Sequence, residues 1–294
     1  MNIIWTVFLG VIGAACGSFV GALTWRMKHN RDIDEQAAKK STTKKTKQTT
    51  EIVKEKLSWV NGRSICEHCG HKLSALDLIP IASWIHLRGK CRYCHKKIGA
   101  SAILLEIGTA AVFVISFIFW PFCLSTLSII LFVIWLLIVV VMTALLVYDA
   151  RWRLLPNPLI LTLIVLSAAF AVINYFFIQR LSVANFATTI IYGLVPITGI
   201  YGALWAVSRG KLIGLGDVKL GVAIGLLLNW QLGLFVLITA NFLATIAVMP
   251  LLLRKSAKLN SQIPFGPFLI IATFFAVIFA PQILNFLRQT LFLI

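Results

Sequence analysis

The chain has 294 residues, of which 59% are hydrophobic and only 13% are charged, a composition that excludes an ordinary soluble domain. Lys and Arg outnumber Asp and Glu by 27 to 10, which gives a net charge of +17. The positive charges gather between apolar runs. They therefore indicate membrane topology and contact with the anionic lipid bilayer, and they argue against binding to nucleic acid.

Eight apolar runs approach or exceed the roughly 20 residues that a membrane-spanning helix needs. They cover residues 2–25, 101–120, 124–148, 157–178, 184–207, 218–229, 232–253 and 266–290. The sixth run is short and would have to be tilted, kinked or buried in protein. The first run lacks the basic start of a secretory signal, so we expect it to be a retained helix. The sequence predicts an all-α, polytopic membrane helix bundle of about eight transmembrane helices.

The location of the basic residues predicts the orientation of these helices. Of the 27 Lys and Arg residues, 17 lie between Arg26 and Lys97, and most of the others cluster at 151–153, 209–219 and 254–258. Two apolar runs separate each cluster from the next. All four clusters can therefore face the cytoplasm, with both termini on the outer side, as the positive-inside rule requires.

The cytoplasmic loop, residues 27–100, has two dissimilar parts. Residues 28–58 are rich in Lys and Thr and poor in large apolar side chains, which predicts a mobile or frayed-helix insert. A basic patch on the membrane surface is the alternative function for this insert. The sequence thus divides into a first transmembrane helix (1–26), the cytoplasmic loop (27–100) and a transmembrane core (101–294).

The second part of the loop, residues 64–97, holds two C-x2-C motifs that are 21 residues apart, formed by Cys66, Cys69, Cys91 and Cys94. This spacing is typical of a zinc knuckle with four thiolate ligands, and Gly70 and Gly89 suit the tight turns beside them. Such a Zn2+ ion would be structural, because four thiolates leave no position for water. Two structural disulfides are the alternative, which a reducing cytoplasm disfavours.

The other histidines and cysteines of the chain receive simpler interpretations. Three histidines near the motifs, His68, His71 and His95, could replace a thiolate ligand, but we expect them to be solvated loop residues. Cys16 and Cys123 lie in apolar runs and are expected to be buried small hydrophobic residues.

Three acidic residues lie outside the loop: Glu106, Asp149 and Asp217. Ionisable groups at membrane depth are costly and by default mark function. Asp149 ends the third run in ALLVYDARWRLLPN, and Asp217 lies where the sixth run begins, in KLIGLGDVKLG. Two runs separate these aspartates, so both are expected on the cytoplasmic side at similar depth.

A pair of carboxyl groups suits peptide hydrolysis without a serine, cysteine or metal nucleophile. Two such groups a few ångströms apart share one proton, so one acts as base toward water while the other polarises the scissile carbonyl. Gly214 and Gly216 would let an extended substrate approach. Taken alone, each aspartate could instead be an interfacial cap or a partner of a cation such as Arg151. Glu106 is expected to form a structural pair with Arg26 or another cation.

These residues resemble the bacterial prepilin peptidases, or type IV leader peptidases, of the GxGD class of intramembrane aspartic proteases. The resemblance covers nearly the whole chain except residues 28–58. Its markers are Gly17-Ser18-Phe19 with Arg26, the paired C-x2-C motifs with DLIPIASWIHLRGKCRYC, Asp149 followed by Leu155-Pro156-Asn157, Gly214 to Leu220, and Ile263-Pro264-Phe265-Gly266-Pro267.

The resemblance implies an enzyme of the bacterial inner membrane. Such enzymes cut the leader from type IV prepilins or pilin-like pseudopilins at the cytoplasmic face, and their two catalytic aspartates fall on Asp149 and Asp217. Many members also N-methylate the new amino terminus with S-adenosyl-L-methionine. That activity is associated with the cysteine-containing region and with a glutamate that matches Glu106.

Three other functions use the same residues. A proton-coupled transporter could use Asp149 and Asp217 as a relay, but it would show a hydropathy repeat and acids near the midplane. A presenilin-type protease shares Tyr148-Asp149 and Gly-x-Gly-Asp, yet it lacks the loop with four cysteines. A zinc-organised membrane scaffold would require both aspartates to be structural.

Overall fold

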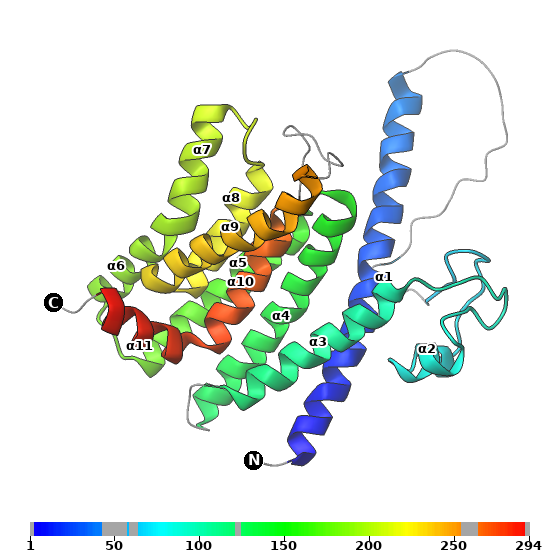
Figure 1. Cartoon of the computed structure of the whole chain (residues 1–294), viewed down its shortest axis with the longest axis horizontal. Coiled ribbons are helices and arrows are strands. Elements are labelled where there is room, and N and C mark those ends of the chain that lie inside the picture. Colours follow the sequence, from blue (N-terminus) through cyan, green and yellow to red (C-terminus); the bar gives the residue numbers. More distant parts are fainter. Residues whose placement is uncertain (1–2, 43–57, 59–63, 121–124, 254–263, 292–294) are drawn as a thin grey trace. The chain divides into compact units, whose positions relative to one another are not determined.

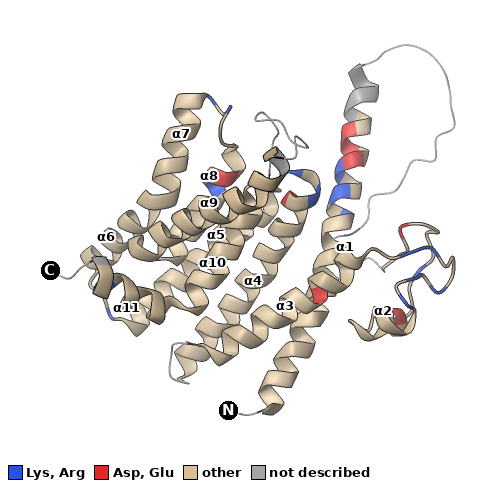
Figure 2. Ribbon diagram, viewed as in Figure 1, with Lys and Arg blue, Asp and Glu red and all other residues tan. Residues whose placement is uncertain are grey.

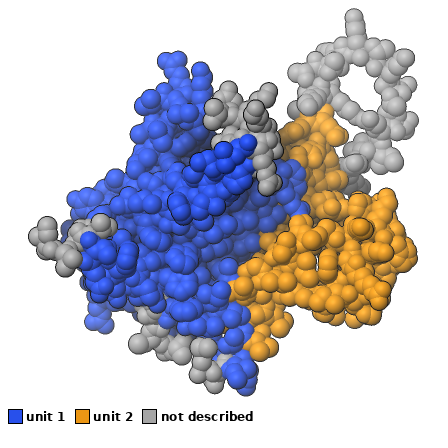
Figure 3. Space-filling model, viewed as in Figure 1, with its two compact units in different colours: residues 1–6, 112–294 blue, residues 7–111 orange. Residues whose placement is uncertain are grey.

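The computed structural model describes residues 3–42, 58, 64–120, 125–253 and 264–291. All regular elements in these ranges are helices, apart from two isolated β-bridges, so the prediction of an all-α protein is confirmed. The chain forms two compact units (Figure 3). The smaller contains residues 7–111, and the larger contains residues 1–6 and 112–294.

All eight predicted apolar runs fold as helices, but they do not all reach across a membrane. Six helices in the described ranges are long and apolar enough to span it, and the bent pair α10–α11, with an angle of 87° between its helices, would be a seventh. The remaining run forms α8, Leu215–Leu227, which has 13 residues. At 1.5 Å per residue α8 is about 20 Å long, which is too short for a bilayer core of about 30 Å.

The smaller unit contains most of α1 (Ile3–Thr42), the short helices η1 (Ala75–Leu78) and α2 (Ala82–His86), and the first turns of α3 (Ala100–Ile118). Helix α1 runs past the predicted boundary at residue 26. Residues 28–42 of the predicted insert are therefore helical, with ion pairs Lys28–Asp32 and Arg31–Glu35 at i,i+4 spacing. Residues 43–57 of the insert lie outside the described ranges.

The larger unit contains the last turns of α3 and the helices that follow it in the chain (Figure 1). These are α4 (Thr126–Trp152), α5 (Asn157–Ala171) with the π-helix η2 (Val172–Ile178), α6 (Val183–Leu194), the π-helix η3 (Val195–Gly199), α7 (Ile200–Ser208), α8, α9 (Trp230–Leu253), α10 (Gly266–Ile278) and α11 (Ala280–Leu291). In this unit the charged residues lie at helix ends, while the helix bodies carry few charges (Figure 2).

Helix α8 lies within the packing of the larger unit and contacts α5, α6 and η3. Glycines permit this close approach. A Cβ atom at Gly193 of α6 would lie only 2.6 Å from the carbonyl oxygens of Gly225 and Leu228. Small residues at helix interfaces allow backbones to approach in membrane proteins, where packing rather than hydrophobic burial drives association. The buried helix α8 thus gives Asp217 a rigid support.

Candidate active site

Asp149 lies in the last turn of α4, and its side chain is directed into the protein. Helix α4 ends at Arg153, which has a left-handed conformation (φ 55°) and donates its N–H to the Asp149 carbonyl at 2.7 Å. Asp149 is only 5% exposed. In the described part of the chain, its carboxylate is hydrogen-bonded by the Gly266 N–H, whereas the guanidinium of Arg151 lies over the ring of Trp152.

The contact with Gly266 comes from the first turn of α10. The N–H of Gly266 donates to Asp149 Oδ2 at 3.1 Å, and a Cβ atom at position 266 would lie 2.6 Å from the same oxygen. Pro267 has no N–H, and the N–H of Phe268 donates to the carbonyl of Phe265. Glycine at 266 therefore allows a helix N-terminus to approach a carboxylate directly, where its amide and dipole both favour negative charge.

Asp217 lies in the first turn of α8, which begins after the N-cap Gly214. Its N–H donates to the Gly214 carbonyl at 3.1 Å. Burial, helped by the nearby charge of Asp149, raises the pKa of Asp217 to about 6, against the opposing effect of a hydrogen bond with the Gly214 backbone. The two aspartates thus lie close enough for the charge of one to act on the other.

Two contacts join the segment that follows Asp149 to the segment that contains Asp217. A Cβ atom at Gly216 would lie 3.0 Å from Leu155 Cδ1, and Lys219 Nζ donates to Asn157 Oδ1 at 2.9 Å. Gly216 thus has a packing role: it makes room for Leu155. The motifs Leu155-Pro156-Asn157 and Gly214 to Leu220 hold the ends of α4 and α8 together.

Two polar residues near Asp217 were not identified from the sequence. Tyr201 of α7 is 4% exposed, its hydroxyl accepts a hydrogen bond from Asn241 Nδ2 at 3.4 Å, and it lies within the electrostatic range of Asp217. Its ring packs edge-on against Phe265, with centroids 5.6 Å apart. A tyrosine and an asparagine within apolar runs give no signal of this contact in one sequence.

The smaller unit contains a second candidate site, formed by four free cysteines. The Sγ atoms of Cys66, Cys69, Cys91 and Cys94 all lie within 4.8 Å of one another, and those of Cys66 and Cys94 are 3.9 Å apart. Tetrahedral coordination with Zn–S bonds of about 2.3 Å requires sulfur atoms about 3.8 Å apart. The cluster therefore has the geometry of a metal site, and the disulfide alternative is wrong for these cysteines.

The two C-x2-C motifs form matching knuckles. In each, the first cysteine accepts the N–H of the residue four positions later and donates its own N–H to the carbonyl five positions later, with partners Gly70 and His71 for Cys66, and His95 and Lys96 for Cys91. Gly70 and His95 both have positive φ, of 69° and 56°. His68, His71 and His95 are exposed, as predicted. Cys16 is only half-buried, which corrects its prediction, and Cys123 lies outside the described residues.

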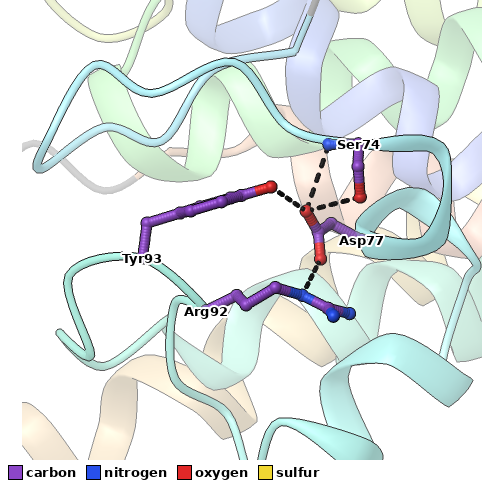
Figure 4. A network of polar contacts seen from close by, with 4 residues as sticks. All are labelled: Ser74, Asp77, Arg92 and Tyr93. Atoms are coloured by element: carbon purple, nitrogen blue, oxygen red, sulfur yellow. Dashed lines mark hydrogen bonds and ion pairs between the residues drawn. The ribbon is translucent and has the colours of Figure 1, made fainter.

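A polar network links Ser74 and Asp77, at the start of η1, to the second knuckle (Figure 4). Asp77 accepts hydrogen bonds from the N–H and hydroxyl of Ser74, from Arg92 Nε at 2.7 Å and from the Tyr93 hydroxyl at 3.1 Å. Burial alone would raise the pKa of Asp77, but these hydrogen bonds outweigh it and lower the pKa below its ordinary value. Because Arg92 and Tyr93 lie between Cys91 and Cys94, the Asp77 carboxylate holds the second knuckle in place.

Glu106 lies in the second turn of α3. Its Oε2 accepts the backbone N–H of Ile81 at 2.7 Å, a partner that the sequence did not predict. A Cβ atom at Gly17 of α1 would lie 2.8 Å from Glu106 Cα. Gly17 and Glu106, both markers in the sequence, therefore meet in the smaller unit.

Two protein-family models match successive parts of the chain. Residues 11–120 match the family model described as "Bacterial Peptidase A24 N-terminal domain", and residues 130–249 match the "Type IV leader peptidase family". No solved structure matches the chain.

Three curated relatives carry the name "Prepilin leader peptidase/N-methyltransferase". The protein from Dichelobacter nodosus is 31% identical over 280 residues, which are 94% of this chain and 92% of the relative. That from Aeromonas hydrophila is 31% identical over 75% of this chain and 73% of the relative, and that from Pseudomonas aeruginosa is 26% identical over 75% and 72%. With a 31%-identical relative matched over nearly its full length, the chain belongs to the type IV leader peptidase family of multi-pass bacterial inner-membrane proteins.

Proposed function

We propose that this protein is a prepilin leader peptidase in which Asp149 and Asp217 form the catalytic pair. The observation that carries the proposal is the meeting of these two acids at the ends of α4 and α8, where the charge of Asp149 acts on Asp217. Asp149 is buried and held by the Gly266 N–H, so its position is fixed before substrate arrives. The names of the relatives supply the substrate class, the type IV prepilins, and pilin-like pseudopilins share its chemistry.

The pair performs hydrolysis with one shared proton. The ionised carboxylate takes a proton from water as the water oxygen bonds to the scissile carbonyl carbon, while the protonated carboxyl gives its proton to the carbonyl oxygen. The resulting intermediate then collapses. The C–N bond breaks as the nitrogen receives a proton from the acid formed in the first step. The other carboxylate takes back a hydroxyl proton from the intermediate, so the leader leaves with a new carboxyl terminus and the shared-proton pair is restored.

We propose that the four cysteines hold a structural Zn2+ ion. The sulfur separations match tetrahedral thiolate coordination, and all four ligands come from protein, so no coordination position remains for a reacting water. The cytoplasmic location predicted for this loop keeps thiols reduced and available to metal. The ion would join the two knuckles, in addition to the ring contact between His71 and Tyr93.

We propose N-methylation of the new amino terminus as a second activity, because the relatives are named for it. S-adenosyl-L-methionine would supply the methyl group when bound. Residues of the smaller unit would bind and orient this donor.

The division of the chain into a first transmembrane helix, a cytoplasmic loop and a transmembrane core, at residues 26 and 100, also remains a proposal.

The decisive experiment incubates the purified protein with a synthetic pilin precursor, with and without S-adenosyl-L-methionine, and reads the product N-terminus by mass spectrometry. Asp149→Asn and Asp217→Asn should each abolish leader removal, because neither amide can act in the shared-proton pair. Asp32→Asn, which changes an exposed carboxylate of α1, is the matched control and should cleave normally. Full cleavage by either of the first two variants would exclude the pair.

A further inference from the structure

The turn at Pro80-Ile81-Ala82 has an uncommon backbone conformation. Ile81 has φ 61° and ψ −53°, and the N–H of Ala82 donates to the Pro80 carbonyl at 2.5 Å. Together these define a γ-turn of the rare form with a positive central φ, which is strained even for unbranched residues. For a β-branched residue a positive φ is a genuine outlier, and such strain persists only where surrounding contacts hold it.

The contact that holds this turn is the Glu106 carboxylate. Its Oε2 accepts the N–H of Ile81, the strained residue itself, at 2.7 Å. A hydrogen bond between a backbone amide and a carboxylate is charge-assisted and stronger than one between neutral groups. Glu106 belongs to α3, so one side chain of a membrane helix holds the loop at the point where the loop backbone is least favourable.

The γ-turn at Ile81 also sets the position of α2 and of the second knuckle. Ile81 is the N-cap of α2, and Trp84 of this helix packs on Gly89, where a Cβ atom would lie 2.9 Å from the indole ring. Gly89 also donates its N–H to the Trp84 carbonyl at 2.9 Å and lies two residues before Cys91. Within the described residues the buried Trp84 Nε1 has no hydrogen-bond partner.

Helix α1 determines where the Glu106 backbone lies. A Cβ atom at Gly17 would be 2.8 Å from both Glu106 Cα and the Leu105 carbonyl oxygen, whereas one at Gly108 would have no atom within 4 Å. Contacts under 3.0 Å with backbone cannot be relieved by side-chain rotation. The carboxylate that holds the turn is therefore itself set by a glycine contact between two helices.

We propose that Glu106 is a positioning residue that acts through Ile81. Its carboxylate maintains the γ-turn, the γ-turn orients α2, and the contact of Trp84 with Gly89 carries that position to the second knuckle. The consequence for methyl transfer rests on the proposed function, whereas the consequence for the loop does not. Glu106 then acts on the loop backbone, through the hydrogen bond that its Oε2 accepts from Ile81.

The test compares Glu106→Gln, which keeps an acceptor oxygen, with Glu106→Met, which has similar length and no comparable acceptor. Leu104→Met, at an exposed position on the same helix, is the matched control. The first readout is amide hydrogen exchange of residues 78–88 in the full-length zinc-loaded protein in detergent. Exchange should rise roughly tenfold in Glu106→Met, the loss expected for one charge-assisted hydrogen bond, and little in the other two variants.

The second readout is the KM for S-adenosyl-L-methionine in methylation of the cleaved product. Glu106→Met should raise this KM about tenfold, while Glu106→Gln should stay within about twofold of the wild type. In an Ile81→Gly background, where the turn is less strained, Glu106→Met should have a smaller effect on both readouts.

Two results would overturn the proposal. One is unchanged exchange in Glu106→Met, which would show that the carboxylate does not hold the turn. The other is equal loss of methyl transfer in Glu106→Gln and Glu106→Met with kcat rather than KM affected, which would indicate a direct chemical role. If the wild type cleaves but does not methylate, the proposed second activity fails, and the exchange experiment still decides the role of Glu106.

Discussion

Gly266 is the residue whose contacts most closely constrain Asp149, one of the two proposed catalytic acids. Its amide donates to Asp149 Oδ2, and the space a side chain would need is filled by the same oxygen. In the sequence, Gly266 was identified only as part of the motif Ile263 to Pro267, which precedes the last apolar run. A requirement for glycine that arises from a carboxylate 117 positions away in the chain has no local signature.

Gly266→Ala should reduce kcat for leader cleavage about 100-fold, because the Asp149 carboxylate must move by a large part of an ångström to admit the new methyl group. KM should change little, since no substrate contact is removed. Gly202→Ala, where a Cβ atom would meet Val218 at an ordinary 3.9 Å, is the matched control. Initial rates on a synthetic precursor measure both constants, and a normal kcat in Gly266→Ala would contradict the geometry.

Asp217 should lower the stability of the fold at neutral pH. Its pKa is raised to about 6 in the folded protein, from an ordinary value of 3.8. Below about pH 4 the Asp217 carboxyl is protonated in both the folded and the unfolded protein, so it does not change stability. As the pH rises to about 6, the unfolded protein loses this proton more readily, and the free energy of unfolding falls. Above about pH 6 the full loss of stability is present.

Asp217→Asn should therefore raise the free energy of unfolding at pH 7 by about 3 kcal/mol while abolishing cleavage. The difference should disappear near pH 4. Thermal unfolding in detergent at the two pH values measures it, with Asp32→Asn as the control for loss of a carboxylate. A variant that is no more stable than the wild type at pH 7 would show that Asp217 is well solvated.

At the scale of helices, the contact between α6 and α8 is made by glycine on both sides. A Cβ atom at Gly193 would lie 2.6 Å from two carbonyl oxygens, and one at Gly225 would lie 2.9 Å from the Gly193 carbonyl. Because α8 carries Asp217, a shift of α8 at its contact with α6 would also move this proposed catalytic residue.

Gly193→Ala should destabilise the protein by about 2 kcal/mol through overpacking. The loss of cleavage activity should follow the loss of stability. Gly202→Ala serves again as control, because it adds the same methyl group where room exists. Equal unfolding temperatures for the two variants would argue against the close approach of these helices.

The sequence predicted the helices well where apolar runs are long, and it predicted the cysteine cluster because C-x2-C spacing is itself the local geometry of a knuckle. The sequence did not show how far the first helix continues past residue 26. Residues 28–42 are polar, but they follow a helix that is already formed, so they need no nucleation and gain support from i,i+4 ion pairs.

Other features of the sites could not have been found in one sequence. The positive φ of Ile81 contradicts the preference of a β-branched residue and arises only because Glu106 holds it. Gly216 was expected to admit substrate, yet its free space is taken by Leu155. Tertiary contacts decide both cases, whereas the proposed pair of Asp149 and Asp217 could be suggested from the sequence, because counting apolar runs places both residues on one side.

At the scale of the whole molecule, the two candidate sites are built by separate units. Every described contact of the cysteine cluster lies within residues 64–98, and the contacts of the aspartates come from α4, α8, α10 and the segments beside them. The two family models divide the chain in a similar place, between residues 120 and 130.

Removal of the metal should therefore affect methyl transfer more than cleavage. Fresh reduced protein should contain about one Zn2+ per chain, and chelation should raise hydrogen exchange across residues 64–98, because structural zinc contributes folding free energy. Methylation should be lost with the metal, while leader removal should retain most of its rate. Absence of zinc in fresh protein, or equal loss of both activities, would contradict this separation.

Helix α1 is longer than a bilayer is thick. Its 40 residues form one unbroken helix (Figure 1), which at 1.5 Å per residue is about 60 Å long, while a bilayer with its headgroups measures about 40–45 Å. The last turns must therefore stand clear of the lipid, in water. Residues 28–42 therefore extend α1 beyond the length that a bilayer with its headgroups requires.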